Sequence, residues 1–301
     1  MSLVLFDEPG PRARRRARIG GLAGIAVLAA VLGWVGWKLQ RSGEFSGEAW
    51  EPYSDIRIWR ALAEALGATV RAAVFAIALA LVYGVIMCAG RLSRRGWVRW
   101  PAAVVVEFFR ATPLVVLILF LWIGFSSQFE DFGERVDDAL PDRLAAIVGA
   151  DQMGSLGPLV VALTLYNGSV LAEIFRAGIL AVPGGQREAA LAVGLRESAV
   201  MRLVLLPQAV RIMLPAIVSQ SVVALKDTSL GFIATYPELV RVGREIYDTY
   251  FNIIPTAFVV ATIYITLNSM LSFLAYRLQQ RQARRYSREA VAVAASAVDV
   301  H

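Results

Sequence analysis

Polar side chains inside otherwise apolar stretches of this chain could bind a small charged molecule. They are Asn167, Ser169, Lys226, Asp227, Thr228 and Ser229. A zwitterionic amino acid needs hydrogen-bond acceptors for its ammonium group and donors for its carboxylate, and these side chains offer both. Placing such groups in a bilayer is costly, so they are retained either for a ligand or for bonds between helices. The sequence leaves both interpretations open.

The composition argues against an enzyme that makes or breaks covalent bonds. The single histidine is His301 and the single cysteine is Cys88, so histidine metal sites, Ser-His triads and a disulfide framework are excluded. No GxxxxGK[ST] pattern occurs, and the lysines are Lys38 and Lys226 alone, so the chain does not itself bind ATP in a P-loop. We therefore predict a non-catalytic protein without a cofactor or a metal of its own.

The apolar content predicts an integral membrane protein. The 301 residues are 57% hydrophobic and 18% charged, and the mean hydropathy is +0.58. A bilayer is crossed by roughly 20 residues of helix. Six stretches meet that length and predict an all-α fold: 19–37, 72–90, 101–125, 156–172, 212–235 and 252–276.

The distribution of arginine predicts the orientation of these spans. Arginines cluster at 12–18, 91–99 and 277–288, whereas acidic residues cluster at 44–55 and 130–142. Because cytoplasmic loops carry the excess of arginine and lysine, six spans with both termini in the cytoplasm of a plasma-membrane protein satisfy every bias. The sequence predicts that 129–151 is an extracytoplasmic loop, either simply solvated or docking a soluble partner.

The first span could instead be a cleavable signal peptide. We favour an uncleaved anchor because the apolar run is longer than a usual signal core and no clean A-x-A site precedes Lys38. The basic cytoplasmic N-terminus, the extra span and the acidic extracytoplasmic segment together form a region over 1–65. The tail at 278–301, with His301 at its end, is predicted to be disordered.

Charged residues near helix ends are expected to hold the fold together. Arg71, close to the outer end of its span, could steer a substrate carboxylate or reach the lipid headgroups, and Thr69 stands beside it. A closing ion-pair network at the cytoplasmic ends, at an inner gate or at a loop base, is predicted for Glu107, Arg110, Glu173 and Arg176. Pro113 and Pro255 are expected to kink or end helices.

The loop between the fourth and fifth spans predicts a structured hairpin. Residues 184–211 read GGQREAALAVGLRESAVMRLVLLPQAVR. We predict a helix over 188–193, a reversal at Gly194, a second helix capped by Ser198, and a junction with the next span at Pro207. An ordinary helix lying on the membrane surface is the alternative, since its arginines suit the headgroups.

The spacing in this hairpin resembles the EAA loop of ABC importer permeases, EAA-x3-G-x9-I-x-LP, with Val204 in place of isoleucine. In that family the loop, here 184–207, is the coupling helix that enters a cleft of a cytoplasmic ATPase subunit. The resemblance implies an ATPase-coupling role for Gln186, Glu188, Ala189, Ala190, Gly194, Leu195, Arg196 and Pro207.

The flanking sequences resemble the polar amino acid branch of that family. FFRATPLVVLILF, LAEIFRAGI and LKDTSLGFIATYPEL carry this resemblance, and LYNGSVLAEIFRAGI is most similar to actinobacterial glutamate permeases. The implied fold is the type I ABC importer permease fold, with a five-helix core over 66–277 and one extra N-terminal transmembrane helix.

The resemblance implies one transmembrane subunit of an ATP-driven importer that works by alternating access, with ATP and Mg bound by the partner ATPase. The implied partners are an ATPase dimer, a second related permease in a heterodimer, an extracytoplasmic binding protein and membrane lipid, with no nucleic acid. Import of glutamine or a basic amino acid is an open alternative. A different class, an ion-coupled secondary transporter, would be expected to show inverted repeats, which are not visible here.

Overall fold

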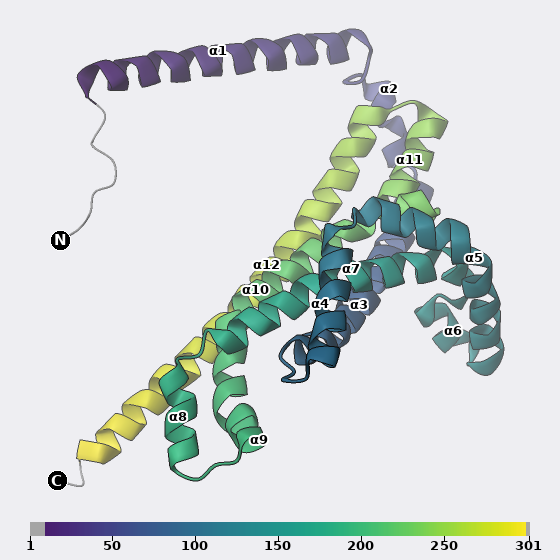
Figure 1. Ribbon diagram of the computed structural model, residues 1–301. Coiled ribbons are helices and arrows are strands. Elements are labelled where there is room, and N and C mark those ends of the chain that lie inside the picture. The colour runs from purple at the N-terminus through teal and green to yellow at the C-terminus, as the bar shows by residue number, and fades with distance from the viewer. Residues whose placement is uncertain (1–9, 299–301) are drawn as a thin grey trace.

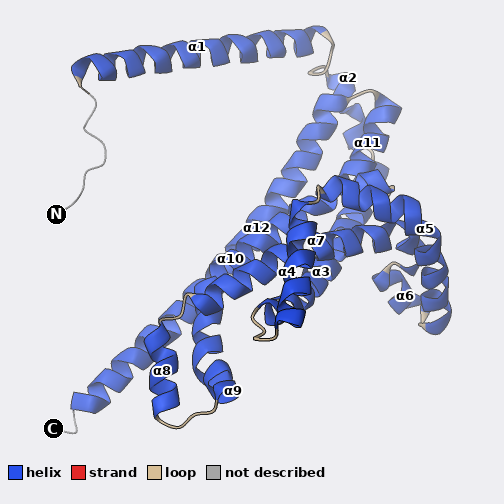
Figure 2. Cartoon of the chain, viewed as in Figure 1, coloured by secondary structure: helices blue, strands red, loops and turns tan. Residues whose placement is uncertain are grey.

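The structure, a computed structural model, describes residues 10–298, and these form helices joined by short loops, without a strand among them (Figures 1 and 2). Within those residues, six helical segments are long and apolar enough to cross a membrane: Arg14–Arg41, Ile56–Arg91, Leu114–Ala139, Ala150–Leu180, Glu197–Ala234 and Ile253–Phe273. This confirms the predicted all-α membrane class and the predicted number of spans.

Two long helices, α3 (Ile56–Arg91) and α7 (Met153–Leu180), form the centre of the molecule. Small side chains recur at every fourth position of α3 and are buried: Ala68, Ala72, Ala76, Ala80, Gly84 and Cys88. A Cβ atom added at Gly84 would lie 3.1 Å from the backbone oxygen of Gly168 in α7. Small residues thus let the two backbones approach closely, which is how helices associate where the surrounding lipid is as apolar as a leucine.

Other helices pack around α7. They are α4 (Gly96–Ala111), α5 (Leu114–Ala139) and α10 (Leu206–Asp227). The largest core cluster includes Ile118 of α5, Leu159 and Leu163 of α7, and Tyr236, all fully buried. Tyr236 follows η4 (Thr228–Ala234), so the chain after α10 returns into the core before α11 (Leu239–Tyr250) begins.

The prediction of one continuous span over 101–125 is wrong. Helix α4 ends at Ala111 and α5 begins at Leu114, with Thr112 and Pro113 both in extended conformations between them. Proline disfavours the helical conformation of the residue before it, so the break follows from the local sequence. Of these two helices, α5 is long and apolar enough to cross a membrane by itself, and it runs on to Ala139.

The segment 129–151, predicted as an extracytoplasmic loop, is largely helical, and its side of the membrane stays a prediction. Helix α5 occupies the first part, and α6 (Asp142–Val148) and η2 (Ala150–Gln152) follow. Gly133 allows this return, because a Cβ atom added there would lie 2.7 Å from the Cβ atom of Met153. The acidic residues of this segment therefore lie at the end of α5 and the start of α6, where the chain folds back on the core.

The longest helix is α12 (Ile253–Val298), which runs diagonally through Figure 1 with α10 beside it. Pro255 lies in its first turn, where its missing N–H is no loss. The helix continues through most of the tail that we expected to be disordered. Residues 1–9 and 299–301, including His301, lie outside the described residues.

The extra helix α1 (Pro11–Arg41) leads away from the bundle in Figure 1, and none of its most apolar window is buried. The C-terminal end of α1 leads into a segment that is hydrogen-bonded to the start of α12. Glu44 accepts a hydrogen bond from the backbone N–H of Ile254 at 3.1 Å, and the Asn252 amide donates to the Ala49 carbonyl at 3.0 Å. The Tyr53 hydroxyl lies 2.6 Å from the Thr256 hydroxyl. These bonds fasten the end of α1 to the start of α12.

Candidate coupling hairpin and polar groove

The predicted hairpin is present, with boundaries that differ from the prediction. Helix α8 (Gly184–Ala192) begins four residues earlier than expected, with Pro183 as its N-cap residue. Gly194 has φ of +86°, a left-handed conformation that favours glycine, and it reverses the chain. The predicted cap at Ser198 is wrong: Arg196 is the N-cap of α9 (Glu197–Ala199), and Ser198 lies inside that turn. A π-helical segment, η3 (Val200–Leu205), then joins the hairpin to α10, in which Pro207 occupies the first turn.

One carboxylate holds the hairpin in shape. The Oε1 atom of Glu197 lies 2.5 Å from Nη2 of Arg187, which links α9 to α8. The same oxygen lies 2.9 Å from Nη2 of Arg94, in the connection between α3 and α4. The hairpin is therefore cross-linked internally and also attached to the end of α3.

Apolar contacts fix the inner side of the hairpin. Ala190 is buried in a cluster with Cys88 of α3, Phe175 of α7 and Val200, and Leu195 packs against that cluster. The backbone N–H of Leu195 also donates to the Ala190 carbonyl at 3.2 Å. These two residues of the predicted coupling set face the body of the molecule.

The other side of the hairpin faces outward. Most of the predicted coupling set is exposed: Gln186, Glu188, Ala189, Gly194, Arg196 and Pro207. Val193, an apolar residue beside them, is 78% exposed. The end of the hairpin that lies away from the bundle in Figure 1 thus presents a small mixed polar and apolar face, which is suited to entering a groove on another protein.

The four charged residues predicted to pair at helix ends lie together. Glu107 of α4 is 3.4 Å from Arg110, and Glu173 of α7 is 2.5 Å from Arg176. Arg91, at the end of α3, joins the two pairs, at 3.0 Å from Glu107 and 3.2 Å from Glu173. Three helices are thereby connected, and whether this network acts as a gate stays a prediction. The sequence reasoning missed Arg91, although it stands at the end of a span with other arginines.

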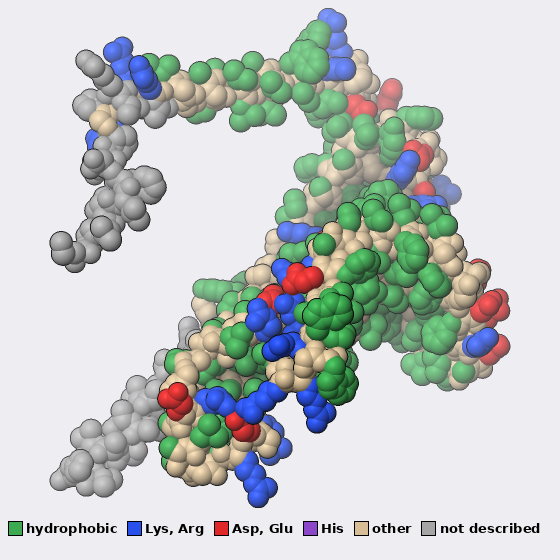
Figure 3. Space-filling view, viewed as in Figure 1, with side chains coloured by type: hydrophobic (Ala, Val, Ile, Leu, Met, Phe, Trp, Pro, Cys, Tyr) green, Lys and Arg blue, Asp and Glu red, His purple; other side chains and the backbone are tan. Residues whose placement is uncertain are grey.

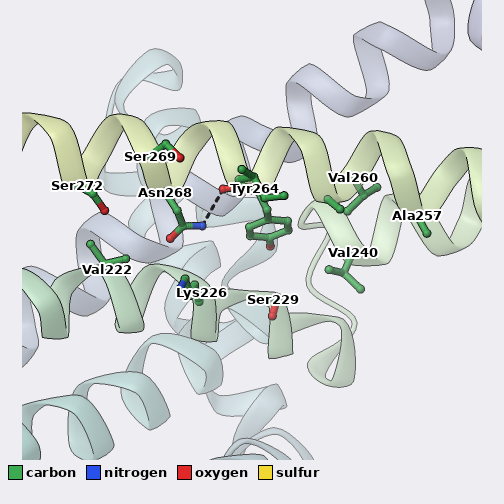
Figure 4. Close-up of a pocket in the computed structure, with 12 residues that line it drawn as sticks. Val222, Lys226, Ser229, Val240, Ala257, Val260, Tyr264, Asn268, Ser269 and Ser272 are labelled. Carbon is green, nitrogen blue, oxygen red and sulfur yellow. Dashed lines mark hydrogen bonds between the residues drawn. The ribbon is translucent and has the colours of Figure 1, made fainter. Parts of the chain in front are cut away.

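A groove of about 870 Å³ lies between α10 and α12 (Figure 4). Two of the predicted pathway residues, Lys226 and Ser229, line it from α10 and η4. From α12, Tyr264 and Asn268 point across the groove toward them. Lys226 is exposed, and no ion pair to it is found within the described part of the chain. The groove thus offers an ammonium, hydroxyls and an amide among valine and alanine side chains.

Asn167 and Asp227 form a separate hydrogen-bonded set with Gln220, in which Asn167 is buried and the other two side chains are half-buried. The Asn167 amide donates to Asp227 Oδ2 at 3.2 Å, and the Gln220 amide donates to Asn167 Oδ1 at 2.6 Å. Asn167 is 1% exposed. This set joins α7 to α10, which is the interhelical bonding that the sequence left open. Ser169 is fully buried nearby on α7.

The remaining predicted pathway residues bond to the backbone of the protein itself. Thr69 is fully buried; its hydroxyl donates to the Ala65 carbonyl at 2.8 Å and accepts from the Leu239 N–H at 3.2 Å. Thr228 is also fully buried and donates to the Leu225 carbonyl at 2.6 Å. Both hydroxyls therefore support the turn that carries η4 and α11.

Arg71 is half-buried and lines a pocket of about 450 Å³ beside α6 and η2, where its donors are used by the protein itself. Its guanidinium donates to the Ala146 carbonyl at 2.9 Å, to the side-chain oxygen of Gln152 and to the Tyr236 hydroxyl at 3.3 Å. It thereby ties α3 to the α6–η2 return and to the chain after η4. Gly149, with φ of +77°, makes room for it, because a Cβ atom there would lie 2.8 Å from the guanidinium carbon.

Glu238 is a further residue that the sequence reasoning missed. It is fully buried as the N-cap of α11, and its carboxylate accepts from the Val240 and Arg241 N–H groups, both at 2.8 Å. The Tyr264 hydroxyl donates to it at 2.9 Å, so it also fixes one wall of the groove. Burial raises the pKa of this carboxyl to about 7. Its place in YPEL, just before an amphipathic helix, was the available signal.

Comparison with known families identifies the chain. Residues 80–285 match the family described as binding-protein-dependent transport system inner membrane component. The chain belongs to this family. The predicted ABC importer permease resemblance, drawn from the hairpin motif and its flanks, is confirmed, and the membrane-spanning helices agree with an inner membrane component.

Curated relatives of this inner membrane component are permease proteins. The glutamate transport system permease protein GluD of Corynebacterium glutamicum is 38% identical over 244 residues, which cover 81% of this chain and 83% of the relative. The glutamine transport system permease protein GlnP of Escherichia coli K12 is 33% identical, with 74% and 95% covered. The histidine/lysine/arginine/ornithine transport system permease protein HisM of Salmonella typhimurium is 30% identical, with 67% and 82% covered.

Solved structures of other transporters share the fold. A chain of an amino acid ABC transporter solved with histidines superposes with a TM-score of 0.63 at 25% identity, covering 76% of this chain and 97% of that one. A chain of the inward-facing MetNI methionine ABC transporter has a TM-score of 0.53 at 20% identity, covering 74% and 93%, and supports the fold alone. The predicted ABC importer permease fold is confirmed.

Proposed function

We propose that the chain is the transmembrane permease subunit of an ATP-driven ABC importer for a polar amino acid, and that the amino acid is glutamate. The observation that carries the proposal is the 38% identity to the glutamate permease GluD over 81% of the chain. The groove supports an acidic substrate as well. An ammonium in a membrane-spanning region, without an ion pair inside the described part of the chain, is a natural partner for a carboxylate.

The hairpin is proposed to transmit the work of ATP hydrolysis. A dimer of ABC ATPase subunits binds the ATP and Mg, and its cleft receives the exposed face around Glu188 and Gly194. The inward side, anchored through Ala190 and Glu197, passes the movement to α3, α7 and α10. Alternating access follows when two permease subunits rotate about their interface. No bond chemistry is assigned to this chain.

The orientation and partners form part of the proposal. Both termini lie in the cytoplasm, because the arginine-rich connection after α3 and the hairpin are on the same side as the basic ends. The acidic α5–α6 region then faces outward, toward a substrate-binding protein. A second, related permease completes the pathway in a heterodimer, since the groove between α10 and α12 is open on one side in a single chain.

Two alternatives remain testable. Import of glutamine or a basic amino acid within the same class is favoured by the 33% identity to GlnP and the 30% identity to HisM. An ion-coupled secondary transporter is the alternative from another class, and it would carry out uptake without any ATPase.

The test begins with the tagged full chain purified from native membranes in mild detergent, together with whatever copurifies. The complex is reconstituted in liposomes, and ATPase activity is measured with the binding protein and each candidate amino acid. Stimulation by glutamate supports the proposal, whereas stimulation by glutamine or arginine alone would reassign the substrate. Uptake by the chain without an ATPase, abolished by an uncoupler, would replace it with a secondary carrier.

Variants of the hairpin test the coupling role separately. Glu188→Lys and Gly194→Asp are expected to abolish stimulated transport at a normal level of membrane insertion. Glu64→Lys, a matched charge reversal at an exposed position of α3, serves as the control. Unchanged transport in both hairpin variants would remove the coupling assignment.

A further inference from the structure

A second pocket, distinct from the groove and the hairpin, opens beside the start of α4. Its volume is about 490 Å³. Its lining consists of Arg91, Gly96, Arg99, Trp100, Ala103 and Arg176. Three arginines from three helices or helix ends therefore surround one space next to an indole ring.

The charge around this pocket is not balanced by its neighbours. Arg91 and Arg176 share the carboxylates of Glu173 and Glu107, as described above. Arg99 makes no ion pair within the described part of the chain. Counting Arg110, four arginines face two glutamates, which leaves two positive charges for an anion from outside. Figure 3 shows Lys and Arg side chains gathered where α4 approaches the α8–α9 hairpin.

Helix α4 also carries an exposed apolar stripe that starts at the pocket. Trp97, Trp100, Val104 and Phe108 follow one another at steps of three and four residues, so they lie on one face of the helix. They are 74%, 71%, 46% and 60% exposed. Tryptophan is enriched at the boundary between headgroups and acyl chains, and arginine at that depth reaches the phosphates. Such a stripe is suited to contact lipid acyl chains, and the arginines of the pocket beside it are suited to contact headgroups.

We propose that this pocket binds the phosphate of an anionic phospholipid, with the acyl chains lying along the stripe of α4. The guanidinium of Arg99, and the donors of Arg91 and Arg176 not used by the glutamates, supply charge-assisted hydrogen bonds to the phosphate oxygens. Basic pockets between transmembrane helices are suited to lipid headgroups of this kind. The occupant is a lipid rather than a soluble phosphate compound because the apolar stripe continues from the pocket.

The site stands apart from the proposed transport function. Binding of a lipid at the junction of α3, α4 and α7 requires neither a particular substrate nor an ATPase. The purified full chain is therefore sufficient for the test, and a failed lipid experiment leaves the transport proposal untouched.

The test is native mass spectrometry of the purified full chain with phosphatidylglycerol, cardiolipin or phosphatidylcholine added in detergent. We expect the two anionic lipids to be retained in preference to phosphatidylcholine. Arg99→Gln should weaken that retention about fivefold, the effect of one cation at a membrane surface. Arg95→Gln is the matched control, because Arg95 is the N-cap residue of α4 and lies outside the pocket lining, over the ring of Trp97.

Three outcomes would overturn the proposal. An equal loss of anionic-lipid retention in Arg99→Gln and Arg95→Gln would mean that the lipid is attracted to the basic surface in general and does not bind in the pocket. Equal retention of phosphatidylcholine and the anionic lipids would mean that the phosphate charge is not recognised. Displacement of the lipid by millimolar inorganic phosphate would assign the pocket to a soluble anion.

Discussion

Glu238 gives the protein a specific dependence on pH. Its carboxyl is fully buried and capped, and burial raises its pKa from 4.5 to about 7. The folded state therefore binds more protons than the unfolded state between these two values. The free energy of unfolding must then fall as the pH rises from about 4.5 to about 7, and Glu238→Gln should remove that part of the dependence.

The size of the effect follows from the shift. A difference of one pKa unit corresponds to about 1.4 kcal/mol, so this carboxyl contributes about 3 kcal/mol between the two limits. For a chain of this size, that is a change of roughly 5–10 °C in the midpoint of thermal unfolding. A glutamine offers one acceptor oxygen where the carboxyl offers two, so the variant is also less stable in absolute terms, and the pH dependence is the quantity to compare.

The assay is thermal unfolding of the purified chain in detergent at half-unit steps from pH 5 to pH 8. We expect the midpoint of the wild type to fall by several degrees more than that of Glu238→Gln. Glu245→Gln is the control on the same helix, because Glu245 is exposed and paired with Arg241. Parallel curves for wild type and Glu238→Gln would refute the reasoning, as would an equal change in the Glu245 variant.

Three further perturbations test other parts of the structure. Gly133→Ala should destabilise the chain by roughly 1–3 kcal/mol through overpacking, whereas Gly124→Ala, in open space on the same helix, should leave the melting temperature unchanged. Arg71→Ala should cost about 2 kcal/mol and expose the α6–η2 return to limited proteolysis; unchanged cleavage would contradict the clamp. Lys226→Ala should raise the KM for glutamate uptake roughly 10- to 100-fold, and Lys226→Arg should bring the KM most of the way back to the wild-type value. Equal KM values for the wild type and Lys226→Ala would exclude contact between Lys226 and the substrate.

The sequence predicted the class, the spans and the hairpin because each depends on local composition. Apolar length decides whether a helix can cross a membrane, and the EAA spacing places Gly194 where a left-handed residue is needed. The helix break expected at Pro113 is present, since proline restricts the residue before it, although hydropathy had joined the two helices into one span. Local sequence signals thus predicted which helices are present more reliably than where those helices begin and end.

The roles of polar residues could not be derived in the same way, because they depend on which helices meet. Asn167 and Asp227 are far apart in the sequence, and only the packing of α7 on α10 brings them within hydrogen-bond distance. Arg71 could have reached outward, yet the return of α6 places acceptors around it. The groove between Lys226 and Asn268 likewise exists only once α12 lies beside α10.

The row of small residues along α3 has a consequence for handling the protein. The contact between these small side chains and the facing backbone is stabilised mainly by close van der Waals packing, and the expulsion of water adds little to it. Its strength should therefore change little when the bilayer is replaced by a micelle. The α12 side borders an open groove, so we expect detergent to loosen that edge while the α3–α7 pair survives as the last folded unit.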